Sequence, residues 1–189
     1  MIVKIHKSKD LAATMRYAYQ DYKQGEVVAS TCLSVDREGA TQEMALAIAM
    51  REDSVKRPFM HVSLSLDKGE ALSGEQWEAV THAYMKEMGF EHAPYVAIKH
   101  HDTEHEHIHI VASRIDWSQD LVSDSMDYRR SEVLARAFER EHELRELPCS
   151  WEQDGRAPKQ EEYHQSRRLE QPSTRQTIRE ALDHALLSN

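Results

Sequence analysis

Residues 96–115 alternate histidines with β-branched residues, and this pattern restricts the possible folds of the chain more than any other stretch. Five of the chain's 12 histidines fall within residues 100–109, and an apolar run lies on each side of them. Successive side chains of a strand point to opposite faces, so a strand through His107 and His109 places both imidazoles on one face. Ile108 and Ile110 then lie on the other face. The stretch therefore predicts a strand with one apolar face and one face suited to metal binding.

The histidine cluster fits a metal site better than the two simpler interpretations, a purification tag or a solvated polar loop. A tag would be terminal and would not be embedded between β-branched strands. Neutral imidazoles bind Zn, Mn, Fe, Ni and Cu, and three of them with open positions form a catalytic pattern. His107 and His109 are the strongest candidate ligands, and Asp102 is placed to orient a ligand. The candidates for the third ligand are His100, His101 and His105.

The composition is that of a soluble globular protein, with 30% charged and 40% hydrophobic residues in a chain of 189. No apolar run reaches the roughly 18 residues of a membrane span, and no signal peptide is visible, so a cytoplasmic protein is expected. Cys32 and Cys149 are expected to be free thiols. The net charge of −9 argues against a sequence-blind coat for nucleic acid, although residues 1–24 carry a local excess of three positive charges.

Hydrophobic periodicity predicts an α+β domain, with a central antiparallel sheet of about five strands and helices packed mainly on one face. The expected strands cover residues 2–6, 27–33, 59–66, 95–100 and the segment of the His-Ile-His-Ile pattern. The expected helices begin after caps at Ser8, Thr41 and Ser73, and a fourth covers residues 131–144. Strand 59–66 has an apolar side, and its other side carries His61, Ser63 and Ser65. That polar side is either solvated or the working surface of the sheet.

Three tyrosines lie in the first expected helix, which runs to about Lys23. Tyr19 and Tyr22 join the apolar stripe of this helix and are expected in the core. Tyr17 lies about 200° from Tyr19 at about 100° per residue, away from the stripe. Tyr17 is therefore either a half-exposed surface residue or a residue with a chemical role.

The stretch from His100 to Val111 resembles the third motif of the relaxases of conjugative and mobilisable plasmids, the MOB-P class of HUH endonucleases. Its HUH element is similar to His107-Ile108-His109. The catalytic tyrosine of that family lies in an early helical segment, where Tyr17 matches best and Tyr19 and Tyr22 are rivals. The second motif has a serine followed by an acidic turn with a glycine, which Ser65 and residues 66–70 match. The resemblance covers about residues 1–148.

This resemblance implies site- and strand-specific DNA nicking and joining at a plasmid origin of transfer. The Tyr17 hydroxyl would attack a phosphodiester and form a 5′-phosphotyrosine, with Asp102 as the base, directly or through His100. A divalent metal on His100, His107 and His109 would polarise the scissile phosphate, and Ser65 would contact the DNA or support the site. Mn²⁺ or Mg²⁺ is the expected metal, and Zn²⁺ is a further candidate.

The resemblance also implies the partners and the extent of the nuclease domain. The partners are single-stranded DNA with a hairpin near the nick, a relaxosome accessory protein and a coupling protein, with no membrane. The basic residues expected to bind the DNA are Lys7, Lys9, Arg16, Lys23 and Arg114. Residues 1–148 are expected to form the nuclease domain. Residues 149–189 are expected to form a polar linker and a helix that begin a longer C-terminal region.

Three other functions share parts of this pattern. A rolling-circle replication initiator has the same histidine pair, but its tyrosine usually follows the histidines, whereas Tyr17 precedes them. A hydrolase that uses a metal-bound water would not need Tyr17. A regulatory or metal-storage protein would bind metal through the cluster and cleave nothing.

Overall fold

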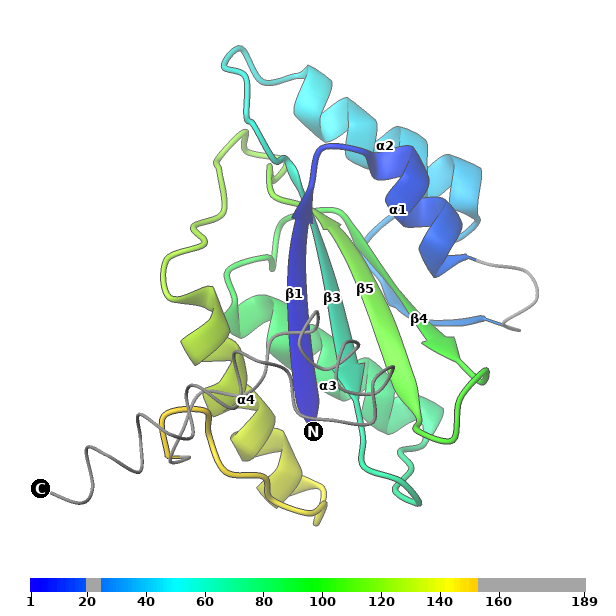
Figure 1. Ribbon diagram of the computed structural model, residues 1–189. Coiled ribbons are helices and arrows are strands. Elements are labelled where there is room, and N and C mark those ends of the chain that lie inside the picture. The colour runs from blue at the N-terminus through cyan, green and yellow to red at the C-terminus, as the bar shows by residue number, and fades with distance from the viewer. Residues whose placement is uncertain (20–24, 153–189) are drawn as a thin grey trace, which may run out of the picture. The chain divides into compact units, whose positions relative to one another are not determined.

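Alternating apolar residues build the central sheet, as the sequence predicts. A computed structural model describes residues 1–19 and 25–152. Within these residues, five strands form one antiparallel sheet in the order β1-β3-β5-β4-β2 (Figure 1). The strands are β1 Ile2–Ser8, β2 Glu26–Ser30, β3 Phe59–Ser65, β4 Tyr95–His100 and β5 His107–Ser113. The predicted α+β class with a five-stranded antiparallel sheet is confirmed.

Capping side chains set where three of the four helices in the described residues begin, and α4 begins without a side-chain cap. These helices are α1 Leu11–Ala18, α2 Arg37–Ala49, α3 Gly74–Glu87 and α4 Asp127–Glu141. The predicted Ser73 cap of α3 is confirmed, together with its capping box to Gln76. The caps predicted for the first two helices are wrong, because Asp10 and Asp36 accept the first free backbone N–H groups instead. Aspartate is as good an N-cap as serine or threonine, so Asp10 and Asp36 can take the place of the predicted caps Ser8 and Thr41.

The fourth helix begins earlier than predicted, at Asp127 rather than Ser131. Ser131 is buried inside the helix, where its hydroxyl lies 2.8 Å from the hydroxyl of Tyr84 on α3. This polar contact explains why a serine lies inside the helix, at a position where the sequence alone suggested the start of the helix. The predicted polar linker and last helix lie almost entirely outside the described residues.

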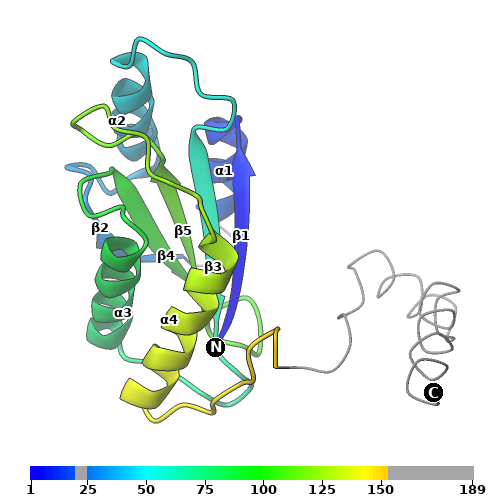
Figure 2. The same ribbon diagram turned by 90° about the vertical axis from the view of Figure 1, so that its left-hand side faces the viewer.

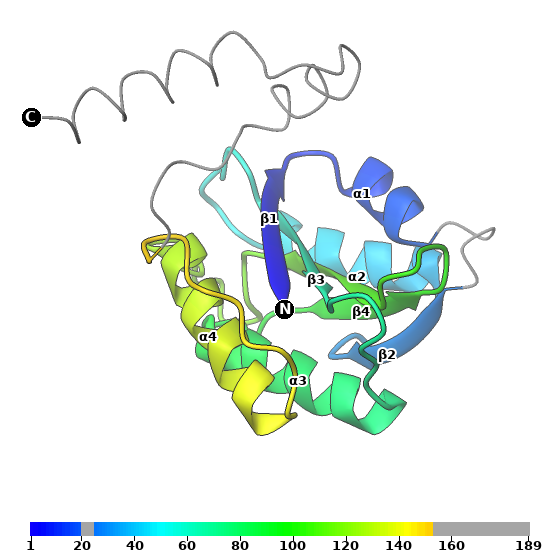
Figure 3. The same cartoon turned by 60° about the horizontal axis from the view of Figure 1, so that its bottom comes forward.

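The two faces of the sheet are covered to different extents. Helices α3 and α4 cover one face, where they pack on a cluster that includes Val62, Leu64, Ile108 and Ile110. Figures 2 and 3 show these helices on the side of the strands away from α1. Helices α1 and α2 cover the other face at one end, over a second cluster formed by Phe59, Val96, Ile98 and Val111 with Leu11, Met15 and Met44.

The rest of that second face carries polar side chains and is called the histidine face here. It comprises Lys4 and His6 of β1, His61, Ser63 and Ser65 of β3, His100 of β4, and His107 and His109 of β5. Cross-strand pairing aligns Lys4 with Ser63 and Ser63 with His109. The end of α1 reaches this part of the face, where Tyr17 contacts His61 and His109 and the carbonyl oxygen of Ala18 accepts a hydrogen bond from His100.

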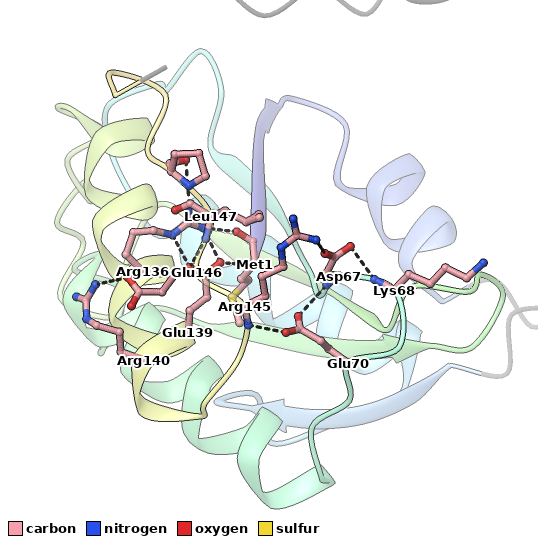
Figure 4. Close-up of polar contacts among 11 residues, drawn as sticks. Met1, Asp67, Lys68, Glu70, Arg136, Glu139, Arg140, Arg145, Glu146 and Leu147 are labelled. Carbon is pink, nitrogen blue, oxygen red and sulfur yellow. Dashed lines mark hydrogen bonds and ion pairs between the residues drawn. The ribbon is translucent and has the colours of Figure 1, made fainter. Parts of the chain in front are cut away.

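Buried and exposed ion pairs link α4 to the start of β1, and the segment after α4 to the loop after β3 (Figure 4). The Glu139 carboxylate is fully buried and pairs with the amino group of Met1 and with Arg136. The same carboxylate accepts a hydrogen bond of 3.1 Å from Leu147 N. Arg145 forms an ion pair with Asp67, at 2.9 Å, on the loop after β3. These contacts hold Leu147 beside the edge of the histidine face.

Residues Met1–Cys149 form one compact unit. The nuclease-domain boundary that we expect near residue 148 remains a prediction. None of the helices in residues 1–19 and 25–152 is long and apolar enough to cross a membrane.

Candidate active site

Strand pairing brings three imidazoles to one point on the histidine face. His100, at the end of β4, is the cross-strand partner of His107, at the start of β5. His109 follows two residues along the same face. One ring nitrogen from each of the three histidines lies within 4.8 Å of the others, and all three side chains are buried. His101 and His105 are exposed in the loop between β4 and β5. The geometry thus singles out His100 among the three candidates for the third ligand.

Hydrogen bonds on the far side of two rings determine which nitrogen each ring turns toward that point. Nε2 of His100 donates to the carbonyl oxygen of Ala18, at 2.7 Å. Nδ1 of His107 donates to the carbonyl oxygen of His105, at 3.0 Å. A carbonyl only accepts, so in the neutral rings the lone pair lies on Nδ1 of His100 and on Nε2 of His107. Both rings are held in the tautomer that a metal ligand needs.

The third ring, His109, is bonded to another imidazole. Its Nδ1 lies 2.9 Å from Nε2 of His61 on β3. Burial lowers the pKa of His61 to about 4, with further lowering from His6 and His100, so that ring is neutral near pH 7. Three neutral imidazole nitrogens around one point are a donor set for a divalent transition metal. His100, His107 and His109 therefore fit a metal that keeps open positions for other ligands.

A cleft of about 440 Å³ opens on the histidine face and is lined by most of the predicted catalytic and metal-binding residues. Its lining includes His107, His109 and Asp102, which are part of the third predicted motif, and also Ser65 and Tyr17. Ser65 is the cross-strand partner of His107, and its hydroxyl lies 3.5 Å from that of Ser63. Asp102 Oδ1 lies 3.5 Å from Nε2 of His107. The carboxylate thus lies beside a candidate ligand and lines the cleft.

Tyr17 reaches the cleft from α1, where it lies off the buried stripe of the helix. Tyr17 is 43% exposed, and the centroid of its ring lies 5.3 Å from that of His109 and 5.6 Å from that of His61. Both contacts are edge-on, with interplanar angles of 78° and 73°. The exposed hydroxyl-bearing ring therefore stands over the histidines rather than in the helix interface.

Tyr19, one of the two rival tyrosines, is less suited to a nucleophilic role than Tyr17. The Tyr19 hydroxyl donates to the carbonyl oxygen of Val35 at 2.7 Å, and burial raises the pKa of Tyr19 well above its usual value. Tyr19 packs against the α1–α2 cluster, in agreement with its predicted core position. Tyr22 lies outside the described residues.

The predicted DNA-binding residues differ in how accessible they are. Lys9 and Arg16 are exposed, and Lys23 lies outside the described residues. Lys7 forms ion pairs with Asp124 and Asp127, at 2.6 and 2.8 Å. Arg114 is 6% exposed and binds Asp124 and the carbonyl oxygens of Arg57 and Val122. These internal contacts give Lys7 and Arg114 a structural role and argue against the predicted contact with DNA.

Sequence reasoning missed Lys4 as a candidate. Lys4 is exposed and lines the cleft together with Tyr17 and His109. The alternation of β1 already indicated where Lys4 points, because Val3 and Ile5 lie on one face of the strand and Lys4 therefore lies on the opposite face. Which face that was depended on the pairing of β1 with β3, and the sequence does not give that pairing.

Residues 14–144 match the family model described as "Relaxase: MobA/VirD2-like, nuclease domain". The chain belongs to this relaxase family. The matched residues include Tyr17, Ser65, Asp102 and all three histidines of the candidate metal site. A comparison with curated proteins gave no match. The relaxase is accordingly a DNA-nicking endonuclease that binds single-stranded DNA, as the motif resemblance predicts, and its histidine triad is suited to a metal.

Proposed function

We propose that this relaxase belongs to the MOB-P class and nicks and rejoins one DNA strand at a plasmid origin of transfer, with Tyr17 as the nucleophile. The observation that carries the proposal is the position of Tyr17, which stands edge-on to His109 at 5.3 Å inside the cleft. A tyrosine that served only the packing of α1 would face the buried stripe with Leu11 and Met15. The reaction is expected in the cytoplasm, where plasmid DNA is accessible.

In the proposed step the Tyr17 oxygen attacks the scissile phosphorus, and the bond from phosphorus to the 3′ oxygen breaks. The proton of the tyrosine passes to the Asp102 carboxylate and is then returned to the departing 3′ oxygen. The products are a 5′-phosphotyrosine and a free 3′-OH. A tyrosine hydroxyl is a weak nucleophile at its usual pKa of about 10, so it needs such a base. Because the new bond keeps the phosphodiester energy, the reverse attack by the 3′-OH rejoins the strand without ATP.

His100, His107 and His109 would hold the divalent metal, and Mn²⁺ or Mg²⁺ is our first choice, with Zn²⁺ as a further candidate. When bound, the metal would polarise the scissile phosphate and neutralise part of its charge. The Asp102 carboxylate lies beside His107 rather than acting through His100, whose Nε2 is already bonded to Ala18. Ser65, next to His107 on the sheet, is positioned for a hydrogen bond to the phosphate on the β3 side.

The DNA strand is proposed to run along the cleft from Tyr17 toward β1. Lys4 provides a cation on that path, while Ile2 and Leu147 provide apolar surface. Ile2 is 53% exposed on the edge strand β1 and is proposed to make an apolar contact with an unstacked base. Lys9 and Arg16 extend the basic path at the surface of α1. A hairpin beside the nick, an accessory protein and a coupling protein remain proposed partners.

The test is a covalent-adduct assay. The protein is incubated with Mn²⁺ and single-stranded oligonucleotides that tile a candidate transfer origin, and adducts that survive denaturation are separated by electrophoresis. We expect an adduct with the wild-type protein and with Tyr19→Phe, and none with Tyr17→Phe. The absence of any adduct with wild-type protein on every oligonucleotide would refute the proposal. Cleavage that persists in Tyr17→Phe without an adduct would favour a hydrolase that activates water.

A further inference from the structure

The contact between His61 and His109 belongs to none of the roles that the sequence predicts for the site. Each of the three clustered histidines is bonded through its second ring nitrogen, and in His100 and His107 that bond goes to a main-chain carbonyl oxygen. In His109 it goes to the side chain of His61, over 2.9 Å. A main-chain carbonyl can only accept, but an imidazole can donate or accept. The state of His109 is therefore determined by another side chain.

His61 is held in place by the sheet and by its neighbours. It is half-buried in the middle of β3, opposite His6 of β1 and Val111 of β5. Its ring lies 4.9 Å from the ring of His109, with an interplanar angle of 31°. The Tyr17 ring meets both imidazoles edge-on. His61 thus touches a candidate ligand and the proposed nucleophile at the same time.

We propose that His61 is a positioning residue for the metal site. Its Nε2 accepts the Nδ1–H of His109, which leaves the lone pair of His109 on Nε2, directed at the point shared with His100 and His107. The contact also fixes the plane of the His109 ring and supports the edge of Tyr17. This inference rests on the proposed metal set, and it adds a fourth histidine that acts through His109.

A neutral partner has a chemical consequence that a carboxylate would not have. A carboxylate at this place would make His109 more basic and would cancel one positive charge of the metal site. An imidazole that accepts the hydrogen bond sets the same tautomer of His109 while leaving the full charge of a divalent ion available to a phosphate. The choice of histidine therefore suits a site whose ligand is a phosphodiester anion.

The test uses Co²⁺ as a spectroscopic probe of the full chain without DNA. Wild type, His61→Phe, His61→Gln and His6→Phe are titrated with Co²⁺, and affinity is measured by competition with a chelator. Loss of such a partner typically weakens metal binding about 10–100-fold, which is the loss expected for His61→Phe, together with a changed visible spectrum. His61→Gln, whose amide oxygen can accept the same bond, should recover most of the affinity. His6→Phe, on the adjacent strand, should behave as wild type.

Two results would overturn the inference, and a third would overturn its basis. Wild-type affinity and an unchanged spectrum in His61→Phe would show that His61 does not position His109. In wild-type protein, ¹⁵N chemical shifts of the imidazoles should show the proton of His109 on Nδ1. A proton on Nε2 instead would contradict the role of His61. This measurement needs no variant, so it tests the inference even if His61→Phe does not fold. A wild-type protein that binds no Co²⁺ would refute the metal set itself, while the adduct assay would still judge the role of Tyr17.

Discussion

The rings of Tyr17 and His109 lie 5.3 Å apart at an angle of 78°, although one comes from the first helix and the other from the last strand of the sheet. The two are brought together because α1 packs through Leu11, Met15 and Ala18 on the cluster that includes Val111. Val111 lies on the same face of β5 as His109, just beyond it. The apolar packing of α1 therefore also sets the distance between the proposed nucleophile and the histidines.

Tyr17 and Tyr19 are expected to differ in what their hydroxyl groups do. Tyr19→Phe removes a 2.7 Å hydrogen bond to Val35, so the free energy of unfolding should fall by about 1 kcal/mol while adduct formation persists. Tyr17→Phe should leave the stability within about 0.5 kcal/mol of wild type and abolish the adduct. Urea denaturation and the adduct assay on both variants measure the two effects. The reverse pattern would make Tyr19 the nucleophile.

The three-histidine site is expected to couple metal binding to stability. An ion that binds only the folded state adds about 2.7 kcal/mol at a concentration 100 times its Kd. Thermal unfolding with and without Mn²⁺ should show this gain in wild type and in His101→Ala, whose side chain is exposed. His107→Ala should lose most of the gain. Equal stabilisation of His107→Ala and wild type would place the metal elsewhere.

Lys4 and Lys7 form a matched pair for testing the DNA path. Lys4→Met should weaken binding of single-stranded DNA and lower the slope of log K against log salt by about 0.7, the value for one phosphate contact on a single strand. Lys7→Met should leave that slope unchanged. It should instead reduce stability by about 3 kcal/mol, because Asp127 is buried and would lose its cation. Fluorescence anisotropy at several salt concentrations and chemical denaturation separate the two outcomes.

Glu106, directly before β5, is expected to make the fold sensitive to acid. Burial by itself would raise the pKa of Glu106, but hydrogen bonds from Leu72 N, Trp77 and Lys99 outweigh burial and lower it. Its stabilising contribution is therefore present above the ordinary glutamate pKa of about 4.5 and is lost as the pH falls below that value.

Glu106→Gln should reduce the free energy of unfolding at pH 7 by about 2 kcal/mol, because it leaves the Lys99 ammonium, 3.0 Å away, without its anion. The variant should also show a shallower loss of stability below pH 4.5. Glu104→Gln, two residues earlier in an exposed pair with Lys68, should change little. Urea denaturation from pH 3 to pH 7 would check this, and parallel acid profiles for wild type and Glu106→Gln would contradict it.

Some of the site was predictable because its geometry is local. The two-residue period of a strand alone puts His107 and His109 on one face, and the 3.6-residue period of a helix alone puts Tyr17 off the stripe of Leu11 and Met15. Motif order then relates Ser65 and Tyr17 to the histidines. The cap of α3 at Ser73 is local in the same sense, since the capping box is complete within four residues.

What the sequence determined by itself is the α+β class, the alternation that creates a histidine face, and the motif that marks a relaxase. Only the tertiary structure shows that His100, rather than His101 or His105, lies with His107 and His109, because that position depends on the register of β4 against β5. It also turned Lys7 and Arg114 toward Asp124, brought Lys4 into the cleft, and set His61 against His109. Periodicity fixes which way a side chain points along one strand, whereas neighbours across strands follow from pairing and packing between distant segments. His61 of β3 therefore lies against His109 of β5, although 48 positions separate the two residues in the sequence.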